Sequence, residues 1–276
     1  MKTRVMSSIV LIPLVLAAIL VGHWSFALLV VVATLIAGSE FAAMLKPKGY
    51  SIIVALLWLV ILVWEAGAFW GKERWLGLAM VFLVMLSAVW QIFRCENEDA
   101  DVAFHRNPTA SWALSLAGGI YLGVGGAYLI KLRGLSDGLW WTLMALPIVW
   151  IVDSAAYFLG RAFGKHKMAP RLSPGKTWEG YVGGLVGGML SGLLLAGVWA
   201  EVSPVPTRLS PWRGLLLGVI LAVLTPLGDL FVSMIKRDVG VKDSGKLIPG
   251  HGGAFDRIDS LIWAGILTWS VVRLIT

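Results

Sequence analysis

Long apolar runs separated by short polar stretches make up nearly the whole chain. Nine runs have about the length that a helix needs to cross the hydrocarbon layer of a membrane, roughly 20 residues. We place them at residues 6–22, 25–44, 51–70, 75–93, 111–130, 138–160, 180–199, 212–233 and 259–275. They lack the alternation of a transmembrane barrel strand, and in lipid a helix satisfies its own backbone hydrogen bonds. The pattern predicts an all-α, polytopic membrane helical bundle of about nine transmembrane helices, with eight or ten as alternatives.

The composition supports this interpretation. Of 276 residues, 58% are hydrophobic and 14% are charged, against about 25% charged in soluble domains. A soluble globule of this length could not cover so much apolar surface. We expect the first run to be an uncleaved helix rather than a signal peptide, because another spanning run follows almost at once.

The positions of Lys and Arg predict the orientation. With the N-terminus in the cytoplasm, 16 of the 23 Lys and Arg residues fall on the cytoplasmic side and 7 on the other, which is the usual bias. We expect an integral protein of the cell (inner) membrane. We divide the chain into residues 1–110, with about four helices, and residues 111–276, a catalytic part with cytoplasmic loops at 161–180 and 234–258.

Acidic residues within the predicted helices are the first candidates for a functional site. A charged group at mid-membrane costs roughly 2.5 to 3.5 kcal/mol, so it normally faces a protein or water-filled interior and has a partner. The candidates are Glu40, Glu65, Asp153, Asp229 and Asp259. Groups such as Glu40, Glu65 and Asp153 more often pack between helices or pair with a basic residue than bind a ligand, and Asp153 is the best functional candidate of these three.

Spacing brings some of these acids together with other polar groups. Asp229, Ser233 and Lys236 are four and then three residues apart, so they share one face of a continuing helix. Asp256 and Asp259 share a face if the last helix begins within the sequence FDRID. Two nearby carboxylates repel unless a cation or proton lies between them. Carboxylates and hydroxyls suit Mg²⁺, whereas one cysteine and four histidines without ligand spacing disfavour zinc.

Two loops have the composition of a phosphate site. The sequence PGHGGAFDRIDS (249–260) places glycines, which allow close backbone approach, beside Arg257 and the two carboxylates, and a polyphosphate needs such groups. In SPGKTWEG (173–180), GKT differs from a P-loop because Pro170 stands where that motif requires glycine. We expect Thr177 to cap the following helix, with Lys176 beside its N-terminus where an anion could bind. A plain junction between loop and helix is the alternative.

The sequence SMIKRDVGVKDSGKLIPGHGGAFDRID (233–259) resembles the C-terminal signature of the phosphatidate cytidylyltransferase family. Ala254 departs from the family, which usually has a larger aliphatic residue there, and this indicates altered packing. DSAAYFLGRAFGKHK (153–167) and PRLSPGKTWEG (170–180) are also similar to the family, so the resemblance covers the second half of the chain. The matching positions are Ser233, Lys236, Arg237, Lys242, Asp243, Gly245, Ile248, Pro249, His251, Gly252, Gly253, Asp256, Arg257 and Asp259.

The resemblance implies a reaction in which phosphatidic acid attacks the α-phosphorus of CTP, giving CDP-diacylglycerol and pyrophosphate. It implies Mg²⁺, with a second metal ion as an open question, and membrane lipids as surroundings. Nucleic acid is not an expected partner, and a homodimer is common for such bundles. The catalytic candidates are Lys236, Arg237, Asp256 and Asp229, and the metal candidates are Asp229, Asp256 and Asp259. The substrate-binding candidates are Ser173, Lys176, Thr177, Ser233, Lys242, His251 and Arg257.

Two alternatives stay open. Another CTP-dependent enzyme, a lipid kinase or nucleotidyltransferase, would need similar metal and triphosphate groups. An ion-coupled transporter would use Asp153 and Asp229 as an ion or proton pathway, but it predicts acids spread through the membrane depth and repeated halves. The strongest polar cluster of this chain lies at one end of the predicted bundle, and the sequence shows no repeat.

Overall fold

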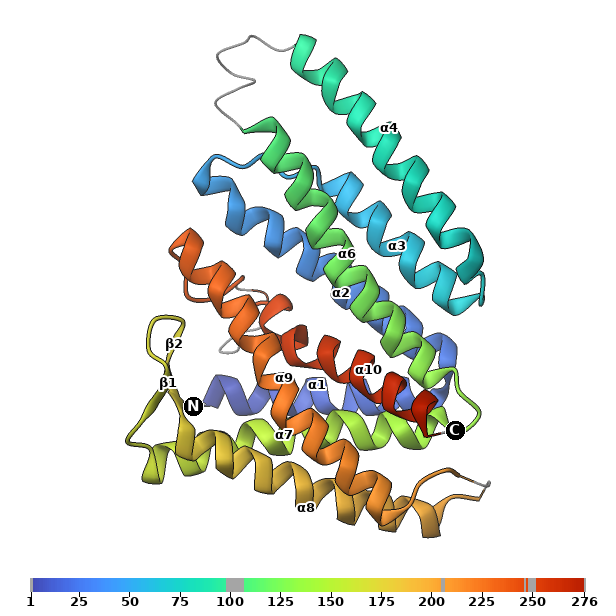
Figure 1. Ribbon diagram of the computed structural model, residues 1–276, viewed down its shortest axis with the longest axis vertical. Coiled ribbons are helices and arrows are strands. Elements are labelled where there is room, and N and C mark those ends of the chain that lie inside the picture. Colours follow the sequence, from blue (N-terminus) through green and yellow to red (C-terminus); the bar gives the residue numbers. More distant parts are fainter. Residues whose placement is uncertain (1, 98–106, 205–206, 246, 248–251, 276) are drawn as a thin grey trace.

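A computed structural model of the chain describes residues 2–97, 107–204, 207–245, 247 and 252–275. Within these residues it is an all-α bundle of nine α-helices with one short β-ribbon (Figure 1). The helices are α1 (Lys2–Val21), α2 (His23–Leu45), α3 (Val54–Phe69), α4 (Leu76–Asn97), α6 (Pro108–Arg133), α7 (Gly138–Phe163), α8 (Trp178–Val202), α9 (Pro211–Val239) and α10 (Phe255–Leu274). Short 3₁₀ turns, η1 (Lys46–Lys48) and η2 (Glu73–Trp75), follow α2 and precede α4.

Each predicted apolar run is helical, but not every helix has the predicted length. Six of the described helices, α2, α4, α6, α7, α8 and α9, are long and apolar enough to cross a membrane. The run predicted at 51–70 was too long, because α3 has only 16 residues. The residues just before α3 are not helical. The backbone N–H groups of Ser51 and Ile53 donate instead to the hydroxyls of Ser111 and Ser115 on α6 (2.9 and 2.8 Å).

Both basic loops are shorter than predicted. Helix α9 continues to Val239 and ends where Gly240 takes a left-handed conformation (φ 81°), the usual role of glycine after a helix. Lys236 and Arg237 therefore lie on the last turn of α9 and not in a loop beginning at 234. In the other loop, strands β1 (Lys167–Ala169) and β2 (Ser173–Thr177) pair antiparallel.

Helix α10 lies at the centre of the bundle, where it contacts α2, α6, α7 and α9. On one side of it, α3 packs against α6, and α2 contacts both of them. On the other side, α8 packs closely against α7 and α9 (Figure 1). The N-terminus of α10 is therefore a point at which residues from both halves of the sequence can meet.

Glycines, several of them in the stretch GGLVGGMLSG (183–192), allow α8 and α9 to approach closely. A Cβ on Gly192 or Gly218 would overlap the backbone of the other helix, at Gly214 and Gly188 respectively. Close approach through small residues is a common way to pack helices in lipid. These glycines therefore allow the close packing of α8 on α9.

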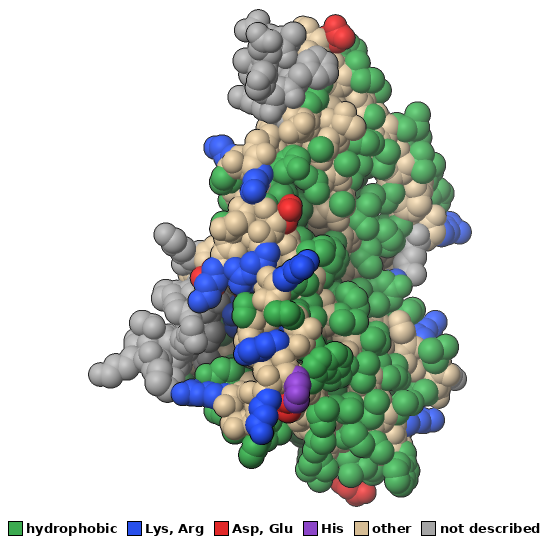
Figure 2. Space-filling model, turned by 60° about the vertical axis from the view of Figure 1, so that its left-hand side comes forward, with side chains coloured by type: hydrophobic (Ala, Val, Ile, Leu, Met, Phe, Trp, Pro, Cys, Tyr) green, Lys and Arg blue, Asp and Glu red, His purple; other side chains and the backbone are tan. Residues whose placement is uncertain are grey.

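The helix ends gather on two opposite sides of the bundle. The N-terminus and the β1–β2 ribbon lie at the left of Figure 1, and the C-terminus lies at the right with the connections α6–α7 and α8–α9. Lys and Arg side chains cluster around the ribbon in Figure 2, whereas hydrophobic side chains cover much of the remaining surface in view. The structure therefore places the predicted basic loops at the same end.

An ion pair stabilises the opposite end. Arg208, between α8 and α9, donates through Nε and Nη2 to both carboxylate oxygens of Asp137 (3.0 and 2.5 Å), and Trp141 donates to the same carboxylate (2.9 Å). Burial alone would raise the pKa of Asp137, but the hydrogen bonds from Arg208 and Trp141 outweigh it and hold that pKa below its ordinary value. The pair fixes the α6–α7 connection to the segment before α9.

Candidate active site

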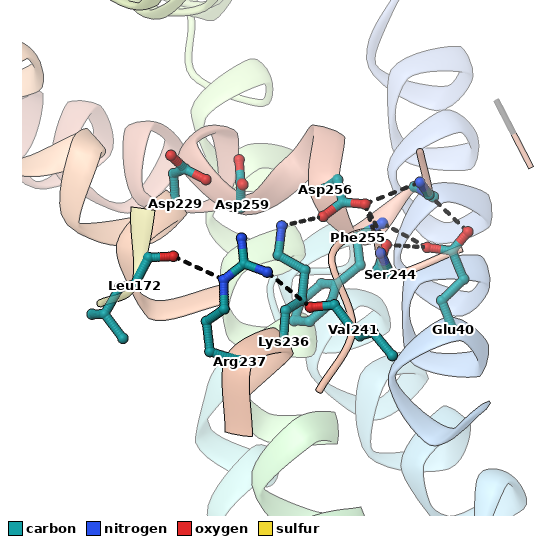
Figure 3. A network of polar contacts seen from close by, with 12 residues as sticks. Glu40, Leu172, Asp229, Lys236, Arg237, Val241, Ser244, Phe255, Asp256 and Asp259 are labelled. Carbon is teal, nitrogen blue, oxygen red and sulfur yellow. Dashed lines mark hydrogen bonds and ion pairs between the residues drawn. The ribbon is translucent and has the colours of Figure 1, made fainter. Parts of the chain in front are cut away.

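A buried ion pair at the start of α10 is the centre of the candidate site (Figure 3). Asp256, in the first turn of α10, accepts a hydrogen bond from Lys236 Nζ of α9 (2.6 Å). Both residues are only 8% exposed. The other carboxylate oxygen accepts from the backbone N–H (2.8 Å) and hydroxyl (2.9 Å) of Ser244 and from the N–H of Gly253 (3.1 Å). Asp256 thus binds both ends of the α9–α10 connection.

A second group of charges lies next to this pair. Lys176 of β2 forms an ion pair with Asp229 of α9 (2.7 Å) and also donates to the carbonyl of Pro226 (3.1 Å). The carboxyl groups of Asp229 and Asp259 lie side by side (Figure 3). Asp153 of α7 lies within electrostatic range of Lys176, Asp229 and Arg257. Residues from α7, β2, α9 and α10 therefore converge.

The ribbon is fixed to the end of α9. Arg237 is exposed, and its guanidinium donates to the carbonyls of Leu172 (3.1 Å) and Val241 (3.3 Å). At the other end of the ribbon, Thr177 Oγ1 accepts from the N–H of Gly180 (3.1 Å), which confirms the predicted helix cap. Ser173 begins β2. These contacts hold Lys176 over the acids of α9.

The remaining candidates lie around the cluster or outside it. Ser233 is buried on α9 between Asp229 and Lys236, and Lys242 is exposed just after that helix. Arg257 is exposed on α10. His251 lies outside the described residues. The structure thus brings the acids, Lys176 and Lys236 together, while Lys242 stands at the edge.

Glu40, which was expected to pack between helices or to pair with a basic residue, lies against the start of α10. Glu40 of α2 accepts hydrogen bonds from the hydroxyl of Ser244 and from the backbone N–H groups of Ala254 and Phe255, each at 3.0 Å. An acid within an apolar run was the only signal. Its partners could not be identified from spacing, because they lie more than 200 residues away along the chain.

A cavity of about 490 Å³ adjoins the polar cluster. Asp153, Asp256, Arg257 and Asp259 line one part of it, and apolar side chains of α1, α2, α6, α7 and α10 line the rest, among them Leu11, Val30 and Leu146. This volume is in the usual range for small-molecule sites. The cavity could accommodate an amphipathic ligand, with its charged group at Arg257 and its apolar part between the helices.

The ligand chemistry fits Mg²⁺ that is shared with a substrate. Among the described residues, no three carboxylate, His or Cys side chains are grouped closely enough to hold a metal ion by themselves. Mg²⁺, however, is commonly bound by one or two carboxylates together with substrate phosphates. The neighbouring carboxylates Asp229 and Asp259 meet that requirement, whereas both oxygens of Asp256 already accept hydrogen bonds.

Comparison with known proteins gives a consistent result along the whole chain. The chain is 34% identical over 268 residues to phosphatidate cytidylyltransferase of Staphylococcus haemolyticus, covering 95% of both chains. It is 35% identical to the protein of that name from Haemophilus influenzae, covering 95% of this chain and 94% of the other. For the Mycobacterium tuberculosis protein of that name the identity is 32%, with 90% and 74% covered. The sequence model described as the cytidylyltransferase family matches residues 2–275. The resemblance first noted in the C-terminal signature thus extends over all the helices, and the chain belongs to the cytidylyltransferase family.

Proposed function

We propose that this protein transfers the cytidylyl group of CTP to phosphatidate, forming CDP-diacylglycerol and pyrophosphate. One observation carries the proposal: a cluster of acidic and basic side chains adjoins a largely apolar cavity at the start of α10. The similarity to phosphatidate cytidylyltransferases over 95% of the chain supports the same reaction.

The reaction makes one P–O bond and breaks another. An oxygen of the phosphatidate phosphate attacks the α-phosphorus of CTP, the bond from that phosphorus to the β-phosphate bridge breaks, and pyrophosphate leaves with the electron pair. The attacking oxygen is already ionised, so the protein does not need to remove a proton. Its work is to bring two anions together in line and to balance their charge.

The basic side chains supply this balance. Lys176 and Lys236 point toward the acids and pair with Asp229 and Asp256, and each ammonium can exchange a carboxylate for a phosphate oxygen. Arg257 faces the cavity and would contact the lipid phosphate. Arg237 and Lys242, both exposed at the end of α9, would contact the triphosphate from outside. Ser173, Thr177, Ser233 and His251 stay candidates for further contacts with the substrates.

Asp229 and Asp259 would hold Mg²⁺, and Asp256 could join them only by releasing one of its present hydrogen bonds. The ion, when bound, would neutralise phosphate charge and stabilise the leaving pyrophosphate. The apolar part of the cavity would take the first part of the acyl chains, since it is lined by Leu11, Val30 and Leu146.

A membrane location is part of this proposal. We assign the nine described helices to the membrane, with the ribbon and the α9–α10 connection in the cytoplasm, where CTP is available. The basic charge of this end supports that orientation. It would also attract anionic lipid and nucleotide.

The test uses CTP labelled in either the α- or the γ-phosphate. Purified protein is incubated with this CTP and Mg²⁺, and the label is measured in the lipid and in pyrophosphate. With phosphatidate as acceptor, label from the α-phosphate should enter the lipid and label from the γ-phosphate should leave in pyrophosphate. A lipid kinase would instead move the γ-phosphate to the lipid, and diacylglycerol would then serve as acceptor. Transfer of the γ-label, or no turnover of CTP by folded protein, would refute the proposal. EDTA should abolish turnover, and added Mg²⁺ should restore it.

A further inference from the structure

Glu40 joins α2 to the backbone at the start of α10. Its Oε1 accepts from the N–H of Ala254, and its Oε2 accepts from the N–H of Phe255 and the hydroxyl of Ser244 (Figure 3). The first N–H groups of a helix have no partner within the helix. A carboxylate from another helix thus takes the place of a local cap, since Ala254, just before α10, provides no side-chain cap.

Two glycines of the α9–α10 connection leave room for this carboxylate. A Cβ on Gly245 would overlap Oε1, Cδ and Cγ of Glu40. A Cβ on Gly253 would overlap Oε2 of Glu40 and the hydroxyl of Ser244. The connection therefore closes around Glu40 from both sides, and a side chain at either glycine would move the loop.

Ser244 joins Glu40 to the buried ion pair. Its hydroxyl lies 3.0 Å from Glu40 Oε2 and 2.9 Å from Asp256 Oδ2. Asp256 directly follows Phe255 in α10. A shift of the Phe255 N–H relative to Glu40 therefore also displaces Asp256. A chain of contacts thus leads from α2 through Ser244 and the first turn of α10 to Lys236.

From this geometry we infer that Glu40 is a positioning residue for the transfer reaction. It fixes the α9–α10 connection so that Lys236, Asp256 and Arg257 keep their relative places. The inference rests on the proposed function, because it takes those three residues as parts of the active site. Glu40 belongs to the first half of the chain, whereas the other residues of the site belong to the second half. Through Glu40, the first half of the chain therefore helps to set the geometry of the site.

The amide variant Glu40→Gln tests the inference with little change in size. One of the two oxygens becomes an NH₂ group, which places a donor against the N–H of Ala254 or of Phe255. The first turn of α10 must then shift, and a displacement of about 1 Å can cost on the order of 100-fold in rate. We expect kcat to fall by about 10- to 100-fold, with KM for CTP and phosphatidate changed by less than about threefold.

Glu65→Gln is the matched control. Glu65 is a buried acid of the same half, and its hydrogen bond from Thr34 (2.9 Å) joins α3 to α2 rather than to the start of α10. The thermal stability of both variants is measured beside their kinetics. We expect Glu65→Gln to keep kcat within about twofold of the unchanged protein. Unchanged kcat in Glu40→Gln, or an equal loss in both variants that follows their loss of stability, would overturn the inference.

A second pair of variants does not depend on the stability of Glu40→Gln alone. Made alone, Gly245→Ala should reduce kcat, because the added methyl group would overlap the carboxylate of Glu40. In the Glu40→Ala background that space is free, so Gly245→Ala should cause no further loss. An equal further loss in both backgrounds would overturn the inference. Full activity of Asp256→Asn would instead refute the assignment of the site itself, and the role of Glu40 with it.

Discussion

The Lys236–Asp256 pair allows the cost of removing one charge to be worked out from the structure. The pair is buried, and Nζ and Oδ1 are 2.6 Å apart. Asparagine at position 256 keeps one acceptor oxygen. If that oxygen takes the place of Oδ2, it still accepts from Ser244 and Gly253, but the amide nitrogen then faces the Lys236 ammonium. In the opposite orientation the amide nitrogen would face the three groups that donate to Oδ2, which costs more. The first orientation is therefore favoured, and in it the buried Lys236 ammonium has lost its counter-charge.

We therefore expect Asp256→Asn to lower the free energy of unfolding by about 3–5 kcal/mol, the cost of breaking a buried pair from one side. Lys236→Met should cost a similar amount, because it leaves the carboxylate unpaired. The double variant Lys236→Met/Asp256→Asn should recover much of the stability, since no buried charge remains alone, but it should stay inactive.

The assay is chemical unfolding in detergent, followed by tryptophan fluorescence, with CTP turnover measured on the same samples. The interaction energy comes from comparing the double variant with the sum of the two single variants. If Asp256→Asn unfolds within about 1 kcal/mol of the unchanged protein, the pair behaves like an exposed one, and our reasoning about its burial is refuted. A double variant as unstable as the sum of the single variants would also contradict it.

Three other predictions concern different parts of the molecule. Gly218→Ala should destabilise the protein by about 1–3 kcal/mol through overpacking of α8 on α9, whereas Gly197→Ala, with no atom closer than 3.8 Å, should not; equal thermal shifts of the two variants would refute this. Asp137→Asn should lower the free energy of unfolding at pH 7. The difference in free energy between this variant and the wild-type protein should shrink as the pH falls below about 3.9, the pKa of Asp in the unfolded chain, toward the lower pKa of Asp137 in the folded protein. Over that range the wild-type protein also loses the ionised carboxylate. Unfolding curves at several pH values measure this, and a deficit that is independent of pH would contradict it. Lys176→Gln should reduce kcat/KM for CTP by about 10- to 100-fold through loss of a charged hydrogen bond, whereas Lys167→Gln on exposed β1 should change it by less than about threefold; similar effects of both would point to general surface charge.

Much of the fold could be predicted because the membrane imposes a simple requirement on the sequence. A helix that spans lipid needs about 20 apolar residues, so the runs are visible in the chain, and their order is the order of the helices. The cap at Thr177 was also predictable, because hydrogen bonds between residues three apart depend on local geometry. The exceptions, the short α3 and the longer α9, arise where contacts with α6 or a glycine cap set the helix end.

The candidate site was predictable as a set of residue types, but not as a set of contacts. The face shared by Asp229, Ser233 and Lys236 follows from helical spacing, and the resemblance of residues 233–259 indicated the reaction. Neither could show that Lys236 pairs with Asp256 or that Lys176 pairs with Asp229. The choice of partner depends on how α7, α9, α10 and the ribbon cross, and several acids were available to each lysine.

Hydrophobicity and helical spacing are local properties that each segment carries with it, so the order of amino acids alone predicts a bundle of apolar helices with charged groups at one end. The start of α10, the partners of the buried charges and the contact of Glu40 with that helix depend instead on how the segments pack. The contacts of Glu40 join residues more than 200 apart in the chain, and the contact of Lys236 with Asp256 joins residues 20 apart on different helices. Such distances are fixed only when the helices pack together and the buried polar groups find their partners.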